Sequence, residues 1–152
     1  MDDIFVPEHW QNICEKVKAI AEENIFPYVR SKRVRSGVMS ELFENQSAEY
    51  FTSIGIKTKS CDTDKEPDLT FVDRGETCEI KVTSSTKQEW MGNHISKKNS
   101  EYILISWEYT DTLKFSVINV FLNQEDWNRL GNYNGTKINS KTLQNKKVKI
   151  LV

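Results

Sequence analysis

The chain has 152 residues, of which 38% are hydrophobic and 28% charged, which suits one globular domain spanning residues 1–152 and excludes a disordered or collagen-like chain. No apolar run approaches the roughly 20 residues of a membrane helix, no secretory signal is present, and the three cysteines form no CxxC pair, so we expect a cytoplasmic protein without a membrane partner or a disulfide scaffold. The net charge of −1 does not by itself indicate a nucleic-acid partner, although basic residues cluster in two segments.

The first part of the chain predicts two amphipathic helices. Apolar residues recur at spacings of three and four, which predicts one helix over residues 8–24. A second helix is expected over about residues 38–53, with Ser36 or Gly37 at its start and Gly55 after its end. Four basic residues, a charge of +4, lie between these helices at Arg30, Lys32, Arg33 and Arg35.

The rest of the chain predicts mainly strands. Residues 68–73 and 76–82 predict a hairpin, because the glycine of Arg74-Gly75 suits a tight turn. Further elements are expected in chain order: strands at 102–109 and 115–122, a short helix capped by Asn123, and a last strand within the basic segment 131–152. Helices followed by strands in this order predict an α/β (α+β) fold with a central mixed sheet of about five strands flanked by helices.

The hairpin brings charged side chains to one face. A two-residue loop at 74–75 pairs Asp68 with Lys81 and Thr70 with Glu79, and alternation along each strand then places these four side chains together. The opposite face is apolar and is expected to meet the core: Leu69, Phe71, Cys78, Ile80 and Val82.

This charged face suits a divalent cation. Two carboxylates on paired strands lie about 5 to 8 Å apart, close enough to hold one ion, and oxygen ligands favour Mg²⁺ or Mn²⁺. Such an ion can polarise a phosphate and lower the pKa of a bound water, while Lys81 orients that water or offsets negative charge. The same pattern is also typical of an exposed cross-strand salt bridge with a spare glutamate.

The spacing of these residues also resembles a known motif. Pro67-Asp68, ten intervening residues and Glu79-Ile80-Lys81 resemble the signature of the PD-(D/E)xK nuclease superfamily. The resemblance covers about residues 36–122. The predicted arrangement of helix and strands in this range is similar to the family core of helix, three-strand meander, helix and strand. Because the chain is short and has no helicase or ATPase motif, it most resembles a type II restriction endonuclease.

The resemblance implies a role for each motif residue. Asp68 and Glu79 would bind Mg²⁺, with Mn²⁺ as a substitute, the Ile80 carbonyl would add a third ligand, and Lys81 would assist the attacking water. No nucleotide cofactor is implied. The extra catalytic acid that many members carry on the first core helix would correspond to Glu41, or alternatively to Glu44 or Glu49. The segment after Lys81 departs from the family, because its glycine and asparagines predict a loop where a core helix is usual.

Residues that follow Lys81 and those between the two helices are candidates for contact with DNA. Small hydroxyl, amide and basic side chains suit phosphates and base edges, and a tryptophan in a polar setting can stack on a base. A solvated surface is the alternative for each of them. The candidates are Ser84, Ser85, Thr86, Lys87, Trp90, Asn93, His94, Lys97, Lys98, Arg33 and Arg35.

The sequence therefore predicts a Mg²⁺-dependent type II restriction endonuclease that hydrolyses double-stranded DNA at a short specific sequence. Cleavage of both strands of a palindrome needs two active sites related by a two-fold axis, so a homodimer is expected. One alternative is a repair, junction-resolving or mobile-element nuclease on the same core. Another is a non-catalytic DNA-binding or interaction module whose hairpin is only a salt-bridged surface.

Overall fold

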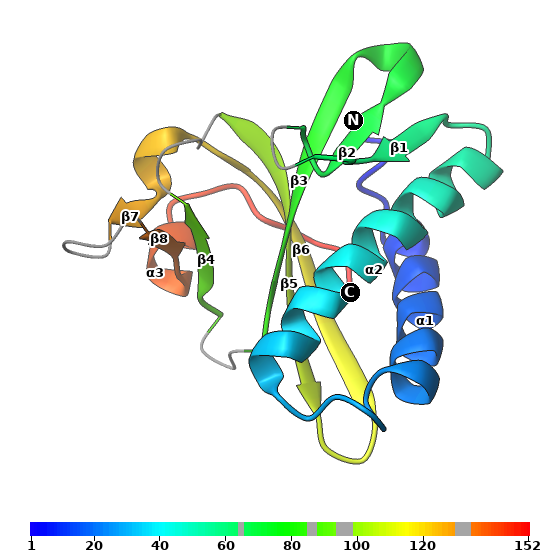
Figure 1. Cartoon of the computed structure of the whole chain (residues 1–152). Helices are drawn as coiled ribbons and strands as arrows, with labels where there is room; N and C mark the ends of the chain where they lie inside the picture. Colours follow the sequence, from blue (N-terminus) through cyan, green and yellow to red (C-terminus); the bar gives the residue numbers. More distant parts are fainter. Residues whose placement is uncertain (64–65, 85–87, 94–98, 130–134) are drawn as a thin grey trace.

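The protein has an α+β fold (Figure 1), seen in a computed structural model that describes residues 1–63, 66–84, 88–93, 99–129 and 135–152. The helices are α1 (Pro7–Asn24), α2 (Lys32–Ser53) and α3 (Ser140–Leu143). The strands are β1 (Thr58–Ser60), β2 (Leu69–Phe71), β3 (Glu76–Thr83), β4 (Trp90–Asn93), β5 (Ser100–Tyr109), β6 (Leu113–Leu122), β7 (Asn128–Arg129), β8 (Gly135–Ile138) and β9 (Lys149–Ile150). Short 3₁₀ turns follow β2 and β6, at Val72–Arg74 and Gln124–Asp126.

Two sheets organise the chain. The main sheet has six strands in the order β1-β2-β3-β5-β6-β9, in which β3 and β5 run parallel and the other neighbours run antiparallel. A smaller sheet has the order β4-β8-β7. The connection from β3 to β5 contains β4 in its described part, so the crossover between the parallel strands passes through the small sheet.

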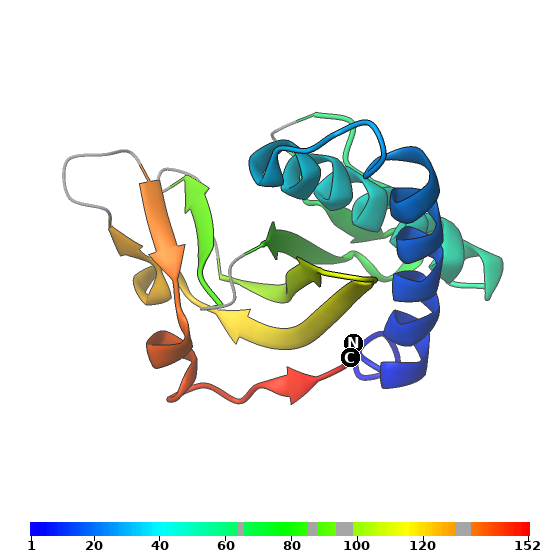
Figure 2. The ribbon, with the colours of Figure 1, turned by 90° about the horizontal axis from the view of Figure 1, so that it is seen from below.

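Each face of the main sheet is covered by a different layer (Figure 2). On one face α1 and α2 pack against apolar side chains such as Ile103 and Ile105, with Trp10 and Phe43 in the same core. On the other face the alternate residues of β5 and β6 meet the small sheet and α3: Trp90, Tyr102, Leu104, Ile118, Val120, Leu122, Trp127, Ile138 and Leu143. Both faces of β5 are apolar, as expected for a strand buried on two sides.

The predicted α+β class is confirmed, with two differences in detail. The main sheet has six strands rather than about five, and the two long helices cover one face instead of flanking both. The second face is apolar as well, and the strands that cover it are too short to show a clear alternation in the sequence. No helix in the described ranges combines the length and the apolar character needed to cross a bilayer.

The predicted ends of the helices are partly correct. Helix α1 matches the predicted range, whereas α2 begins at Lys32 and not near Ser36. The Ser31 hydroxyl accepts a hydrogen bond from the Val34 N–H at 3.4 Å, so Ser31 is the N-cap of this helix. Gly55 follows the helix with a φ of +95°, a conformation that glycine adopts without strain.

The predicted register of the hairpin is wrong by two residues, but the predicted faces are right. Four residues, Val72 to Gly75, connect the strands, so that Phe71 pairs with Glu76 and Thr70 with Thr77. A shift of two positions preserves which side chains share a face, because side chains alternate with a period of two. Leu69, Phe71, Cys78 and Ile80 are buried in the core as predicted, whereas Val82 is only partly buried against it.

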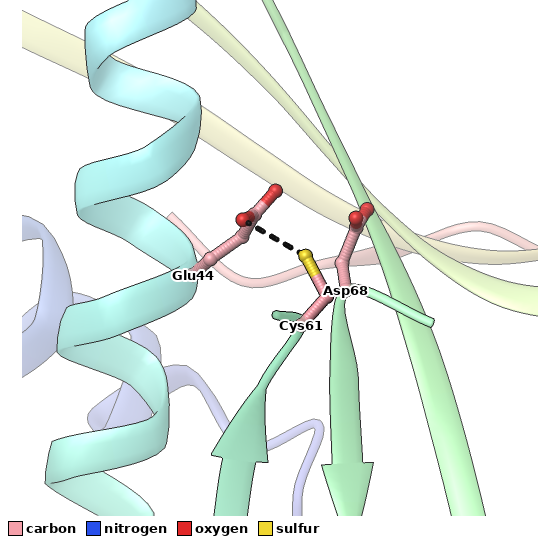
Figure 3. A group of neighbouring side chains, drawn as sticks. All are labelled: Glu44, Cys61 and Asp68. Carbon is pink, nitrogen blue, oxygen red and sulfur yellow. Dashed lines mark hydrogen bonds between the residues drawn. The ribbon is translucent and has the colours of Figure 1, made fainter. Parts of the chain in front are cut away.

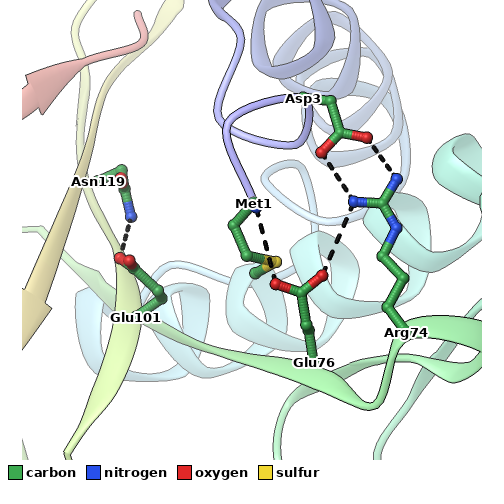
Figure 4. Close-up of polar contacts among 6 residues, drawn as sticks. All are labelled: Met1, Asp3, Arg74, Glu76, Glu101 and Asn119. Carbon is green, nitrogen blue, oxygen red and sulfur yellow. Dashed lines mark hydrogen bonds and ion pairs between the residues drawn. The ribbon is translucent and has the colours of Figure 1, made fainter.

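The N-terminal segment is attached to the turn of this hairpin (Figure 4). The Arg74 guanidinium donates two hydrogen bonds to the Asp3 carboxylate and lies 3.8 Å from Glu76, which is 3.7 Å from the Met1 ammonium. The hydrogen bonds from Arg74 lower the pKa of Asp3 to about 2. These contacts hold the β2–β3 turn at the end of the sheet away from Asp68.

Candidate metal centre

Asp68 lies immediately before β2, at the point where the pairing between β2 and β3 begins. Its Oδ2 atom accepts a hydrogen bond from the Ile80 N–H at 2.8 Å. Because β2 begins only at Leu69, the Asp68 side chain takes the place of a backbone partner for β3 at this position. The N–H and C=O of one residue in an extended strand point to the same side. The Ile80 carbonyl therefore faces the same edge of β3 as the Asp68 carboxylate.

Glu79 and Lys81 lie on β3 with their side chains on the face opposite to the helices. Glu79 pairs in register with Tyr102 of β5, which is buried. Burial and the neighbouring Asp68 raise the pKa of Glu79 to about 7, while Lys81 opposes this shift. Asp68 is thus close enough to Glu79 to hydrogen-bond with it when one of them is protonated, and Lys81 is the cation on the same face.

A third carboxylate and a thiol approach Asp68 from the other side (Figure 3). Glu44 points from α2 towards Cys61, and the Cys61 Sγ donates a hydrogen bond to Glu44 Oε2 at 3.6 Å. The Cys61 N–H also bonds the Asp68 carbonyl at 3.2 Å, which holds the ends of β1 and β2 together. One ligand atom from each of Glu44, Cys61 and Asp68 lies within 4.8 Å of the others.

The pKa values of Glu44 and Cys61 are raised, because both groups are partly buried and lie close to other negative charges. Burial and the nearby Asp68 raise the pKa of Glu44 to about 7, against a usual value of 4.5. Burial and the two carboxylates raise the pKa of Cys61 to about 11, so the thiol is a hydrogen-bond donor at neutral pH. A cation placed between the carboxylates would favour their charged forms.

Of the three candidates for the helix acid, Glu44 is the one beside Asp68. Glu41 and Glu49 are exposed, whereas Glu44 is half-buried. Glu44 belongs to the stripe that continues with the buried residues Ala48 and Phe51, at spacings of four and seven. That spacing is the signal in the sequence that favours Glu44 over Glu41.

Two neighbours of the site are not predicted from the sequence. Cys61 lies opposite Asp68 only because β1 pairs with β2, and the three residues of β1 show no apolar alternation. Tyr102 is predicted as part of a strand but not as a neighbour of Glu79, because the parallel pairing of β3 and β5 fixes that contact. Burial and the charges of Glu79 and Asp68 raise the pKa of Tyr102, so its hydroxyl stays protonated.

The structure contradicts one expected DNA contact. The sequence predicts that Trp90 is available for stacking on a base, but it is 1% exposed and its Nε1 donates a hydrogen bond to the Ile105 carbonyl at 2.9 Å. The apolar second face of the main sheet draws it inwards. Trp90 therefore fixes β4 to β5 and is not exposed for stacking on a base.

The other candidates for contact with DNA differ in position and in exposure. Ser84 follows β3 and is half-buried, Arg33 is exposed in the first turn of α2, and Asn93 is described only as a backbone position of β4. The remaining residues lie outside the described part of the chain: Ser85, Thr86, Lys87, His94, Lys97 and Lys98.

Arg35, another candidate for contact with DNA, makes its contacts within the protein. Its guanidinium donates hydrogen bonds to the carbonyls of Phe26 and Val29 and lies 4.1 Å from the centre of the Phe26 ring. Tyr109 adds a second ring at 5.6 Å. These contacts close the loop between α1 and α2.

We expect Arg35→Ala to destabilise the protein by about 2 kcal/mol, because two charge-assisted hydrogen bonds and a cation–π contact are lost. Arg33→Ala, which removes an exposed guanidinium two residues away, is expected to leave the stability unchanged. Thermal unfolding of both variants measures the difference. If Arg35→Ala melts at the temperature of the wild type, the contacts of this guanidinium do not stabilise the loop.

The group as a whole could hold a divalent cation. Asp68 and Glu79 offer carboxylate oxygens, and the Ile80 carbonyl faces the same edge of the sheet, which is a hard donor set of the kind that Mg²⁺ and Mn²⁺ prefer. Glu44 and Cys61 extend the group towards α2. In comparisons of the whole sequence with known proteins, no protein-family model and no curated protein matches this chain.

Proposed function

We propose that this protein is a Mg²⁺-dependent endonuclease that hydrolyses phosphodiester bonds of double-stranded DNA with a PD-(D/E)xK site. The observation that supports this most strongly is the position of the Asp68 carboxylate. It is fixed by the Ile80 N–H at 2.8 Å and lies beside the Glu79 carboxyl. Lys81 follows two residues along the same strand and acts on the charge of Glu79.

The roles follow from the donor set. Asp68, Glu79 and the Ile80 carbonyl would hold Mg²⁺, which when bound polarises a phosphate and lowers the pKa of a coordinated water. The Lys81 ammonium orients the attacking water by hydrogen bonding and offsets negative charge that develops on the phosphate. Glu44 faces Asp68 from the helix side and is placed to accept a hydrogen bond from a second water in the site.

The topology supports the same proposal. Helix α2, which carries Glu44, precedes the antiparallel strands β1, β2 and β3, and β5 then adds parallel to β3. This order resembles the restriction-endonuclease-like core, with β4 in the described part of the connection where that core usually has a helix. Two carboxylates at a hairpin could also form a simple salt bridge with Lys81, but such a bridge does not require the third carboxylate from α2.

We propose further that the protein is a type II restriction enzyme that acts in the cytoplasm as a homodimer. Two copies of the site, related by a two-fold axis, would cut both strands of a short palindrome. The exposed basic residues at the start of α2, including Arg33, would contact phosphates on the DNA.

Incubation with unmethylated phage DNA tests this function directly. We expect a fixed pattern of fragments with Mg²⁺ or Mn²⁺ and no cleavage with EDTA. Cleavage limited to branched or damaged substrates would instead favour a repair or junction-resolving nuclease. Intact DNA of every form in the presence of Mg²⁺ would reject a nuclease and leave a non-catalytic module.

A further inference from the structure

We propose that Glu44, Cys61 and Asp68 form a Zn²⁺ site that excludes Mg²⁺ and so inhibits the enzyme. The binding of Zn²⁺ follows from these three residues alone. Only the inhibition rests on the proposed function, because Asp68 belongs to both ligand sets.

The geometry of the three side chains suits tetrahedral zinc. A Zn–S bond of about 2.3 Å and a Zn–O bond of about 2.0 Å at a tetrahedral angle place sulfur and oxygen about 3.5 Å apart. The Cys61 Sγ and Glu44 Oε2 atoms are 3.6 Å apart without any rearrangement. A ligand atom of Asp68 lies within 4.8 Å of both, so Asp68 can supply a third ligand and leave a fourth position for water.

The three ligands come from separate elements that hold them in place. Glu44 is on α2, Cys61 follows β1 and Asp68 precedes β2 (Figure 3). The Cys61 N–H also bonds the Asp68 carbonyl at 3.2 Å. The Ser60 hydroxyl also donates to Asn45 Oδ1 at 3.1 Å, which fixes the end of β1 against the same helix. Little conformational freedom is lost when a metal binds, and this favours binding.

The thiol makes the site selective. Thiolate is a soft ligand that binds Zn²⁺ or Cd²⁺ and not Mg²⁺, which prefers oxygen. When the metal binds, the Cys61 thiol gives its proton to solvent and the thiolate forms the metal–sulfur bond. Asp68 is then committed to zinc, so the Mg²⁺ ligand set that includes Glu79 loses one of its carboxylates.

The test is a titration of the whole protein with Cd²⁺ and Zn²⁺. We expect an ultraviolet charge-transfer band of a cadmium–thiolate bond, which Cys61→Ser and Cys61→Ala both lose. Both variants should also bind Zn²⁺ at least about 10-fold more weakly by calorimetry. Glu49→Gln, which removes an exposed acid of α2, is the matched control and should behave as the wild type. Cys14 and Cys78 are buried and remain in every variant.

Each outcome decides the proposal. No band in the wild type, or an equal Zn²⁺ affinity in the Cys61 variants, would overturn the zinc site even if the protein cleaves DNA. A band together with Mg²⁺-dependent cleavage that Zn²⁺ inhibits in the wild type, but less in Cys61→Ser, would support it fully. A band in a protein that cleaves no DNA would support the zinc site and reject the nuclease.

Discussion

Asp68→Asn is expected to lower Mg²⁺-dependent DNA cleavage by about 10³-fold or more while the protein stays folded. The amide oxygen of asparagine can still accept the hydrogen bond from the Ile80 N–H, so the junction of β2 and β3 is preserved. The lost negative charge removes a metal ligand, and a metal ion contributes several kcal/mol to such a reaction, where each 1.4 kcal/mol is about tenfold in rate. Initial rates on plasmid DNA measure the effect.

Two further variants show whether this loss is specific. Asp73→Asn changes an exposed aspartate in the turn of the same hairpin and should cleave as the wild type does. Lys81→Ala should retain metal binding, because it keeps both carboxylates, but should lose cleavage. A fully active Asp68→Asn protein would reject the assignment of the site.

Without a divalent cation, the stability of the protein is expected to fall as the pH rises from about 4.5 to 8. The pKa values of Glu44 and Glu79 are both raised to about 7 in the folded protein, from a usual 4.5. The folded state therefore holds protons that the unfolded state has released, so the stability falls between these pKa values and levels off above the folded pKa of about 7. Because both carboxyls are partly exposed, solvent screening reduces the effect to on the order of 1 kcal/mol.

Magnesium should reverse this loss, because an ion that binds only the folded state stabilises it. We expect the melting temperature in EDTA to be lower at pH 8 than at pH 5.5, and millimolar Mg²⁺ to raise it at pH 8 but hardly at pH 5.5. Glu79→Gln should flatten the pH dependence and weaken the response to Mg²⁺, whereas Glu49→Gln should change neither. An identical pH profile in Glu79→Gln and the wild type would mean that the pKa of this carboxyl is not raised in the folded protein.

The sequence predicts much of the fold where apolar periodicity is strong. Helix α1 and strands β5 and β6 have clear patterns and lie where they are predicted, within two residues at each end. The faces of the hairpin are also predicted correctly, because the burial of Leu69 and Cys78 requires only the alternation of side chains. The register could not be predicted, since it depends on the 3₁₀ turn after β2.

The composition of the site could be predicted only in part. Asp68, Glu79 and Lys81 come from one hairpin, so a local pattern places them on one side of the sheet. Glu44 and Cys61 come from a helix and a three-residue strand, and their approach to Asp68 depends on how α2 and β1 pack. The polar neighbours of Trp90 in the sequence predict an exposed side chain, yet long-range packing against β5 buries it.

The most direct test of the proposed metal site is the position of a bound cation. Crystals grown with Mn²⁺ and measured for anomalous scattering should show a peak within coordination distance of the Asp68 and Glu79 carboxylates and the Ile80 carbonyl. With saturating Mn²⁺, the lack of a peak at these three groups, or a peak only elsewhere on the protein, would contradict the proposed metal site.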